Sequence, residues 1–257
     1  MTKALRILLD GLIDYAGLFP PAALPMHDAT RNYARYRESE HSWALGRFVV
    51  QSERIEEVPR TFPLSVLASP ADIPPREPVL EIKATSAAEI AQIAQQAAGR
   101  TVFIEVTDLT LLDAIRAGGF YAKIRTGGLV ADAFPSAETI AAFLRACKAT
   151  GVAFKATAGL HHPLRCVKPL TYEPNAPTGA MHGFVNVFVA ATLLDDAEAI
   201  LAEDDPAAFS FDDEGVSWRD RRATNEELSA MRATFGMSFG SCSFEEPIGD
   251  LKELGWL

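Results

Sequence analysis

Phe-Tyr-Ala-Lys-Ile-Arg-Thr-Gly-Gly at residues 120–128 and Val-Ala-Phe-Lys-Ala-Thr-Ala-Gly-Leu-His-His at residues 152–162 have the same form. Each predicts a β-strand that carries one lysine, Lys123 or Lys155, and that breaks at glycine. Residues 136–150 between them have helical character. The order strand, helix, strand predicts two neighbouring parallel strands. A lysine in a buried strand is costly unless it is paired or used, so the repeated lysine points to a site.

The alternation of strands and helices extends over most of the chain. Besides the two lysine strands, we predict strands at residues 12–18, 47–50, 64–68, 79–84, 101–106 and 182–186. Eight strands within roughly 200 residues favour a closed (β/α)8 TIM barrel over an open, doubly wound sheet. No glycine-rich nucleotide-binding motif is present, which also argues against the open sheet.

The last part of the chain does not follow this rhythm. Four prolines interrupt residues 163–180, which predicts a long loop where a helix is due. Residues 209–218 predict a β-hairpin, residues 226–234 a helix, and residues 238–243 a loop of small residues. We therefore predict a barrel over residues 1–204 and a C-terminal extension, residues 205–257, packed on it. The hairpin would serve as a lid or a subunit contact.

Composition limits the classes of protein and of partner. The chain has 257 residues, of which 48% are hydrophobic and 23% charged, and a net charge of −10. These values suit one large globular domain, or two small ones, and argue against nucleic acid as a partner. No apolar run reaches the length of a membrane span, so no membrane partner is expected and the cytoplasm is the default location. A homo-oligomer stays open.

Cysteine and histidine give no metal-binding pattern. The three cysteines, Cys147, Cys166 and Cys242, are scattered, and Cys242 has no evident base beside it in the sequence, so we expect it to be inert. His161 and His162 are adjacent and point apart, without a third histidine at ligand spacing. We expect neither a metal nor an organic cofactor.

Charged residues recur on one face of the predicted strands. Side chains two apart share a face of a strand, and in a barrel only the lumen near the carboxyl ends of the strands tolerates charge. The charges placed there are Glu81, Lys83, Glu105, Lys123, Arg125 and Lys155, with Asp14 as a seventh. Four cations at one mouth suggest an anionic small substrate. A partly desolvated lysine among other cations loses its proton more readily and can form a Schiff base with a carbonyl. A purely structural ion-pair network is the alternative.

These segments resemble deoxyribose-phosphate aldolase and its lysine-dependent class I relatives. The resemblance rests on Lys123-Ile-Arg-Thr-Gly and Phe154-Lys155-Ala-Thr-Ala-Gly159. Phe103-Ile-Glu-Val and Val79-Leu-Glu-Ile-Lys look like the family's preceding strands, and residues 12–18 look like its N-terminal aspartate segment. Residues 182–186, His-Gly-Phe-Val-Asn, are similar to its final strand and phosphate loop. The likeness covers roughly residues 5–202 and identities are sparse.

The resemblance implies a metal-independent class I aldolase or related carbon–carbon lyase that acts on a small anionic carbonyl compound. Lys123 would form the Schiff base, Lys155 would make Lys123 easier to deprotonate, and Glu81 would act with water as the general acid/base. Glu105 and Asp14 complete the implied catalytic group. The implied substrate-binding residues are Lys83, Arg125, Thr126, Gly127, Thr157, Gly159, His161, His162, Gly183 and Asn186.

The chain also departs from the family pattern. Arg125 stands where the family has a small hydroxyl residue, and His161 and His162 follow the second glycine break. Arg125, His161 or His162 would then hold a carboxylate or a differently placed phosphate. Two alternatives remain open: a barrel isomerase or other enzyme that binds an anionic small molecule without a Schiff base, and a non-catalytic descendant of such a barrel.

Overall fold

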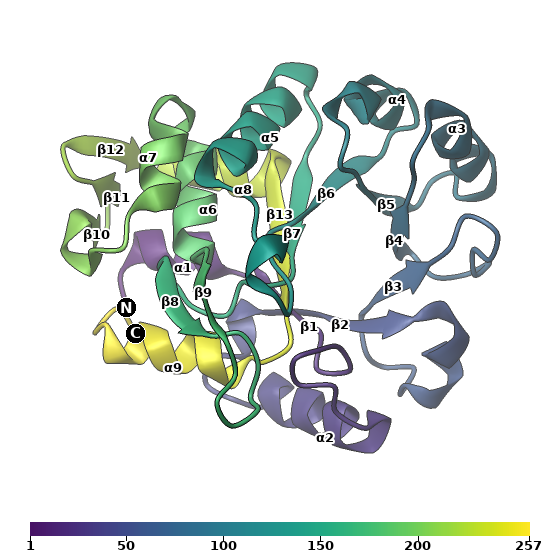
Figure 1. Ribbon diagram of the computed structural model, residues 1–257, viewed down its shortest axis with the longest axis horizontal. Coiled ribbons are helices and arrows are strands. Elements are labelled where there is room, and N and C mark those ends of the chain that lie inside the picture. The colour runs from purple at the N-terminus through teal and green to yellow at the C-terminus, as the bar shows by residue number, and fades with distance from the viewer.

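The computed structural model describes residues 1–257 and contains a closed barrel of eight parallel strands. Neighbouring strands follow the order β1-β13-β7-β6-β5-β4-β3-β2 around the barrel (Figure 1). Their bounds are β1 Ile13–Tyr15, β2 Leu45–Gln51, β3 Leu64–Ala68, β4 Val79–Lys83, β5 Thr101–Glu105, β6 Tyr121–Arg125, β7 Phe154–Thr157 and β13 Gly236–Ser241. The predicted (β/α)8 TIM barrel is confirmed.

The helices cover the outside of the barrel unevenly. Their bounds are α1 Lys3–Leu9, α2 Met26–Arg37, α3 Ala87–Gln96, α4 Leu112–Ala117, α5 Ala137–Thr150, α6 Phe184–Thr192, α7 Ala197–Ala202, α8 Asn225–Thr234 and α9 Glu245–Glu253. No α-helix lies between β2 and β3, where residues 52–57 form a 3-10 turn, or between β3 and β4, where prolines occupy the link. No helix in the structure has the length and apolarity to cross a membrane.

The eighth strand is not the predicted one. Residues 182–186 were predicted as the last strand, but the chain turns into helix α6 at Phe184. Every residue from Phe184 to Ala191 is buried, and all of them except Asn186 are apolar. A short run that is apolar on nearly all sides has no period that separates a buried strand from a buried helix, which explains the error.

β13 takes the eighth place instead. It pairs with β1 and β7, and so closes the barrel with residues from the segment predicted as a loop and assigned to the C-terminal extension. Ser238 and Gly240 have low strand propensity, and barrel closure outweighs that preference. The boundary predicted at residue 204 therefore does not separate a complete barrel from an appendage.

The segment predicted as a long loop, residues 163–180, also differs from the prediction because it contains two strands. Its ends form a two-stranded antiparallel ribbon, β8 Cys166–Pro169 and β9 Thr178–Met181. The ribbon projects beside α9 and is seen at the near face of the barrel in Figure 1. Prolines did prevent a helix here, as expected, but they lie at positions that still permit pairing along an isolated ribbon.

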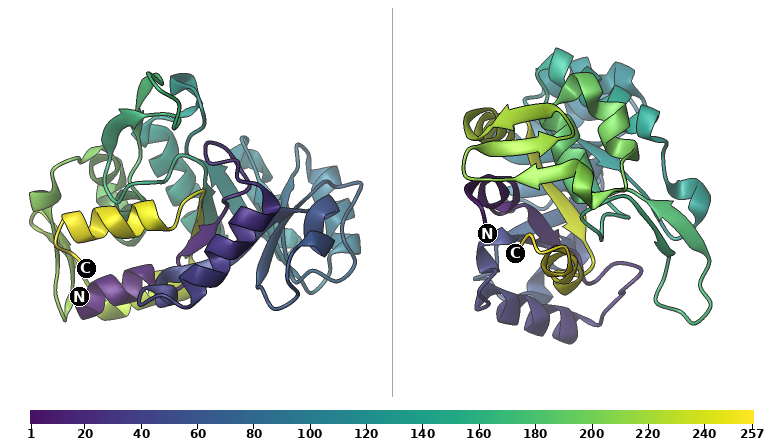
Figure 2. Two further views of the ribbon diagram at one scale, coloured as in Figure 1. Left: turned by 90° about the horizontal axis from the view of Figure 1, so that it is seen from below. Right: turned by 90° about the vertical axis from the view of Figure 1, so that its left-hand side faces the viewer.

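The predicted hairpin and helix of the tail are both present. β10 Phe209–Phe211 and β11 Gly215–Trp218 are antiparallel, β12 Arg221–Thr224 adds a third strand, and α8 follows. This small sheet packs against α1 and α8 at one side of the barrel. Both views of Figure 2 place the two chain termini next to each other on that side. The sheet therefore covers the barrel's outer helices and does not line the cavity described below.

Candidate functional site

Three charged side chains, one of them Lys155, and two serines meet in the lumen of the barrel. Lys155 Nζ lies 2.6 Å from Asp14 Oδ2 and 2.6 Å from Glu81 Oε1. Ser65 donates to Glu81 Oε1 at 2.7 Å, and Ser238 donates to Asp14 Oδ2 at 2.8 Å. All five side chains are buried. Burial of these charges is tolerable because each ammonium and carboxylate has close partners of opposite sign.

Lys123 belongs to the same network. Its Nζ lies 3.1 Å from Glu81 Oε2 and 2.9 Å from Glu105 Oε2, so Glu81 bridges the two lysines through its two oxygens. Lys123 and Lys155 are register partners on β6 and β7, and Glu105 is the register partner of Lys123 on β5. Side chains in register on parallel strands share a face, which places all three in the lumen.

Two of these groups have displaced pKa values. Burial alone would raise the pKa of Glu81, but Lys155 and Lys123, together with hydrogen bonds, hold it well below its usual range. Burial would lower the pKa of Lys155, but Asp14 and Glu81 raise it above its ordinary value. Lys155 is therefore a permanent cation and Glu81 a permanent anion at neutral pH. The implied role of Lys155, an uncompensated charge that drives the proton from Lys123, does not fit a lysine held between two carboxylates.

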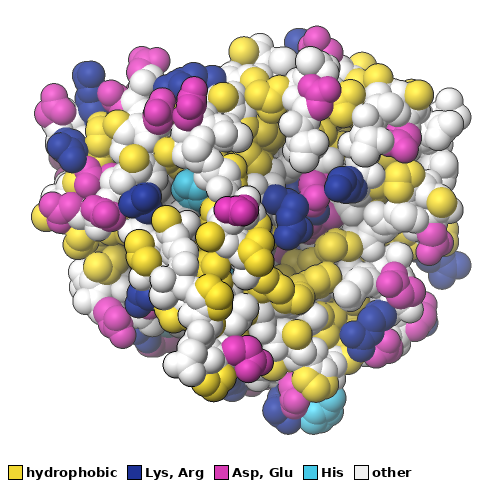
Figure 3. All heavy atoms as spheres, in the orientation of Figure 1, with side chains coloured by type: hydrophobic (Ala, Val, Ile, Leu, Met, Phe, Trp, Pro, Cys, Tyr) yellow, Lys and Arg dark blue, Asp and Glu magenta, His cyan; other side chains and the backbone are white.

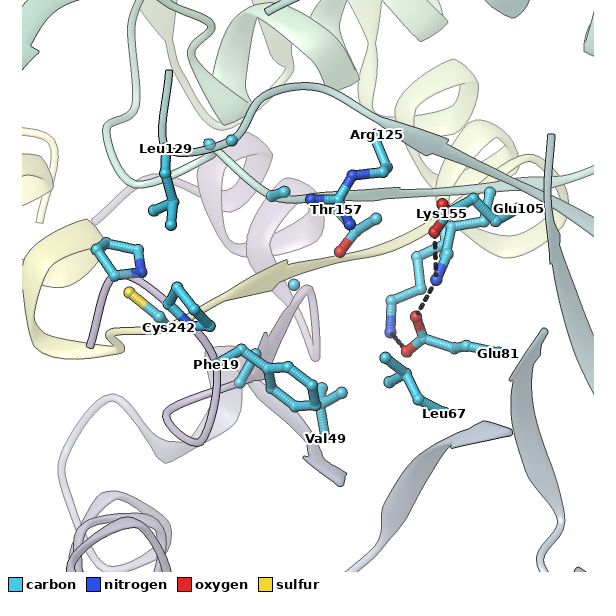
Figure 4. A pocket seen from close by; sticks show the side chains of 18 of the residues that line it. Phe19, Val49, Leu67, Glu81, Glu105, Arg125, Leu129, Lys155, Thr157 and Cys242 are labelled. Carbon is cyan, nitrogen blue, oxygen red and sulfur yellow. Dashed lines mark hydrogen bonds and ion pairs between the residues drawn. The ribbon is translucent and has the colours of Figure 1, made fainter. Parts of the chain in front are cut away.

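A cavity of about 270 Å³ opens from the network toward the barrel mouth. Figure 3 shows a hollow on this face, with basic and acidic side chains at its edge and hydrophobic side chains along its wall. Glu81, Glu105, Lys123 and Lys155 form its charged end, and Phe19, Val49, Leu67 and Leu129 are among its apolar lining. In Figure 4, Cys242 and Leu129 lie on the side of the cavity opposite Glu81 and Lys155.

Arg125 projects over the cavity beside Thr157 (Figure 4). Its guanidinium takes part in no ion pair and no hydrogen bond within the protein, in contrast to both lysines. The side chain is exposed at the end of β6, so desolvation does not forbid an unpaired charge there. A guanidinium with free donors suits a carboxylate or phosphate group. Gly159 and His161 also line this cavity.

Other residues predicted to bind substrate lie elsewhere. Lys83 is exposed and does not line the cavity, because it stands one layer above Glu81 at the very end of β4. Thr126 donates to the carbonyl of Ala158 at 2.6 Å and joins two loops. Gly127 packs against Phe134, whose ring occupies the space of a Cβ. His162 pairs with Asp250 at 2.5 Å, outside the cavity.

Gly183 and Asn186 are structural rather than part of the cavity. Gly183 lies against the backbone of Leu164, where a Cβ has no room. Asn186 accepts from the backbone N–H of Arg165 at 2.9 Å and donates to the carbonyls of Ile200 and Glu203. Both residues lie away from the cavity because this segment leads into helix α6 of the outer layer and does not form a barrel strand.

Sequence reasoning missed three groups at the site. Ser65 and Ser238 orient the charges around Lys155, but single serines in strands carry no signal in one sequence. Cys242, expected to lack a base, lies 3.8 Å from His161 Nδ1. Eighty-one residues separate Cys242 from His161, so only the tertiary fold brings them together.

No protein-family model and no curated protein sequence matches the chain. Two solved structures show a distant likeness. Lysine/ornithine decarboxylase complexed with cadaverine from Vibrio vulnificus is 12% identical, over 60% of this chain and 48% of that one, with a TM-score of 0.38. A mutant of FabK from Thermotoga maritima is 10% identical, over 99% of this chain and 97% of that one, with a TM-score of 0.43. The chain thus spans about half the length of the decarboxylase. Neither likeness bears on activity, and the barrel itself is defined by its strand pairing.

Proposed function

We propose that the protein is a metal-independent, class I aldolase-like carbon–carbon lyase in which Lys123 forms a Schiff base with a small anionic carbonyl compound. The observation that carries the proposal is the position of Lys123 Nζ, which borders an open cavity and contacts Glu81 and Glu105. One of the two ion-pair partners of Lys123, Glu105, is partly exposed, whereas both partners of Lys155, Asp14 and Glu81, are buried.

The reaction uses the groups around Lys123. A proton leaves the Lys123 ammonium for a carboxylate, and the neutral amine adds to the carbonyl carbon. Loss of water gives an iminium, which draws the electron pair of the breaking C–C bond and becomes an enamine. The enamine carbon is then protonated and water releases the second product. The iminium carries a positive charge on the Lys123 nitrogen, so Glu81 and Glu105 stabilise it, whereas the amine and the enamine on either side of it are neutral.

Glu105 is the better candidate for moving protons at this lysine, whereas the family resemblance implies Glu81. Glu81 contacts both lysines and Ser65, and its low pKa makes it a poor base. Glu105 has Lys123 as its ion-pair partner and lines the cavity with part of its side chain exposed. A general acid/base needs contact both with the reacting nitrogen and with solvent or substrate.

The groups on the side of Glu81 away from Lys123 hold this carboxylate in place, and the cavity beside Lys123 has room for a small molecule. Lys155, Asp14 and Ser238 fix the far side of the network. Arg125 offers free donors for the anionic group of the substrate, and Thr157 lies beside it. The cavity of about 270 Å³ is at the low end for ligand pockets, which suits a metabolite of few carbons.

The same ion pairs also favour one alternative, a barrel that retains the charges for stability alone. Each lysine has two carboxylate partners, as a structural network requires. A purely structural network, however, needs neither an open cavity beside Lys123 nor an unpaired Arg125. Chemical trapping distinguishes the structural alternative from the lyase proposal.

Borohydride reduction in the presence of small carbonyl compounds tests the proposal. We expect pyruvate, 2-oxobutyrate or glyceraldehyde 3-phosphate, each incubated with the full chain and borohydride, to leave a reduced adduct that peptide mass spectrometry places on Lys123. Lys123→Met removes the adduct, and Lys168→Met, which changes an exposed lysine of β8, retains it. A carbonyl compound that the protein turns over without leaving an adduct on any lysine contradicts the proposal.

A further inference from the structure

A second cluster of reactive side chains lies at the other end of the cavity. His161 Nδ1 lies 3.1 Å from Glu246 Oε2 and 3.8 Å from Cys242 Sγ. Tyr172, from the β8–β9 ribbon, donates to the same Glu246 oxygen at 3.1 Å. His161 and Cys242 both line the cavity that Lys123 borders. The cluster thus joins α9, the end of β13 and the ribbon around one imidazole.

The hydrogen bonds decide how the imidazole is oriented. Burial would raise the pKa of Glu246, but His161, with His162 and Tyr172, lowers it below its ordinary value, so the carboxylate is ionised and only accepts. His161 Nδ1 must therefore carry the proton that is donated to Glu246. His161 is 7% exposed, and its other ring nitrogen, Nε2, has no hydrogen-bond partner in the protein. A carboxylate that fixes Nδ1–H leaves Nε2 as the nitrogen that exchanges protons.

We propose that His161 Nε2 is a catalytic acid/base for the hydroxyl of the aldehyde-forming half of the substrate, and that Glu246 is its positioning residue. This inference rests on the proposed lyase activity and extends it to a residue outside the lysine network. In cleavage, Nε2 takes the hydroxyl proton while the C–C bonding pair flows to the iminium on Lys123 and the oxygen becomes a carbonyl. In condensation, Nε2 returns that proton to the new alkoxide. No external oxidant or reductant takes part.

The placement of the cluster explains why a second group is needed. Glu81, Glu105 and Lys155 are gathered at the charged end of the cavity, whereas Cys242 and Leu129 lie on the opposite side (Figure 4). A substrate joined to Lys123 would extend its aldehyde-forming part past the apolar wall, toward Cys242. His161 lines the cavity beside Cys242 and can exchange a proton with the hydroxyl of that part. Because hydroxyl deprotonation and C–C cleavage occur together, a base at this end acts in the transition state.

The charge state of His161 supports the assignment and predicts a pH profile. Burial lowers the pKa of His161, but Cys242 and Glu246 raise it, to about 9. The other groups that face this cluster are Tyr172, His162 and Asp250. At neutral pH the imidazolium is the acid form, so cleavage, which needs the base form, should become faster as pH rises toward about 9.

A nitrogen-15 NMR titration of the full chain tests the pair without any substrate. We expect the neutral imidazole of His161 to carry its proton on Nδ1, with Nε2 as the titrating nitrogen. His161→Gln identifies the signal, and Glu246→Gln should move the midpoint to lower pH. A neutral form protonated on Nε2, or a midpoint unchanged in Glu246→Gln, overturns the assignment of the pair.

Kinetics test the role of the pair. With pyruvate as the donor, exchange of methyl protons for deuterium reports enamine formation, and condensation with butanal reports the C–C step. We expect His161→Gln to slow condensation by about 10²- to 10⁴-fold while exchange changes less than about twofold. His27→Gln, which changes a histidine on α2 whose side chain is 81% exposed, should change neither rate.

The outcomes separate this inference from the lyase proposal. If His161→Gln slows exchange and condensation equally, or slows neither, the acid/base role of His161 is wrong. Either result leaves the Schiff-base role of Lys123 unaffected. Glu246→Gln, which retains a hydrogen-bond acceptor, should shift the pH profile of condensation and guards against a folding defect in His161→Gln. If the wild-type protein catalyses no exchange and forms no borohydride adduct, the Schiff-base proposal fails, and the NMR titration still decides whether Nε2 is the titrating nitrogen.

Discussion

Glu81 is the residue on which the lysine network depends. It is 3% exposed and contacts Lys123, Lys155 and Ser65, so both of its oxygens are occupied. Three carboxylates and two ammonium groups in this network leave one uncompensated negative charge, and the unpaired guanidinium of Arg125 lies nearby. Such a site nearly balances its own charge, so we expect an anion to bind at Arg125 rather than at the lysines.

The network should make stability depend on pH in the acid range. Because the folded-state pKa of Glu81 is lower than the ordinary glutamate value of 4.5, its contribution to stability is complete above that value and is lost as pH falls below it. We expect urea unfolding to show that Glu81→Gln costs about 3–5 kcal/mol at pH 7 and that this difference from wild type shrinks below about pH 4.5.

An exposed glutamate provides the control for that measurement. Glu56 is 90% exposed on its side chain and lies 3.8 Å from Arg60. Glu56→Gln should change the free energy of unfolding by less than about 0.5 kcal/mol at any pH. A difference between Glu81→Gln and wild type that grows toward low pH would contradict the pairing described here.

β13 and α6 show how elements, rather than single residues, position the site. β13 places small side chains toward the lumen, where Ser238 reaches Asp14 and where a Cβ on Gly240 would lie 3.3 Å from Thr157 Oγ1. The larger Phe239 is completely buried and stacks on Phe184 of α6. The strand thus leaves room for the cavity on one face and anchors the helix layer on the other.

Asn186 connects α6 with α7 and should contribute to stability, not to chemistry. Two of its three hydrogen bonds go to the carbonyls of Ile200 and Glu203 at the end of α7, and the third accepts from the backbone N–H of Arg165. We expect Asn186→Leu to lower the free energy of unfolding by about 2–4 kcal/mol in urea titrations, because buried polar groups lose their partners. Borohydride labelling of Lys123 in the folded variant should match wild type. If borohydride fails to label Lys123 in a correctly folded Asn186→Leu variant, Asn186 contributes to the site and the purely structural role is wrong.

At the scale of the whole molecule, the barrel needs both ends of the chain. β1, near the N-terminus, pairs with β13, near the C-terminus, and both termini lie side by side (Figure 2). A net charge of −10 surrounds a site that combines lysines with an unpaired Arg125. At the cavity the charges nearly balance and Arg125 has no ion-pair partner, so its guanidinium is the position that we propose for a small anion.

Truncation tests whether the chain folds as one unit. Residues 1–204 lack β13, so the edges of β1 and β7 would be unpaired and Asp14 would lose Ser238. We expect this fragment to show no cooperative thermal unfolding by circular dichroism and to aggregate in gel filtration, while the full chain unfolds in one transition. A monomeric, cooperatively folded 1–204 fragment would instead support an independent barrel with an appended tail.

The sequence alone determined the first seven barrel strands and the lysines on two of them. Strand periodicity, capping residues and glycine breaks are local, so Lys123, Lys155, Glu81 and Glu105 could be placed on one face without coordinates. The predicted helix of residues 136–150 is α5, capped by Ser136 as its side chain implies.

Only the tertiary structure decided the eighth strand, the partners of Lys155 and the cluster around His161. Gly236 to Ser241 has the composition of a loop, and it becomes a strand because the open edges of β1 and β7 require pairing. Asp14 and Lys155 are 141 residues apart, and His161 and Glu246 are 85 apart. Contacts at such separations depend on chain closure and leave no local pattern, so no periodicity in the sequence records them.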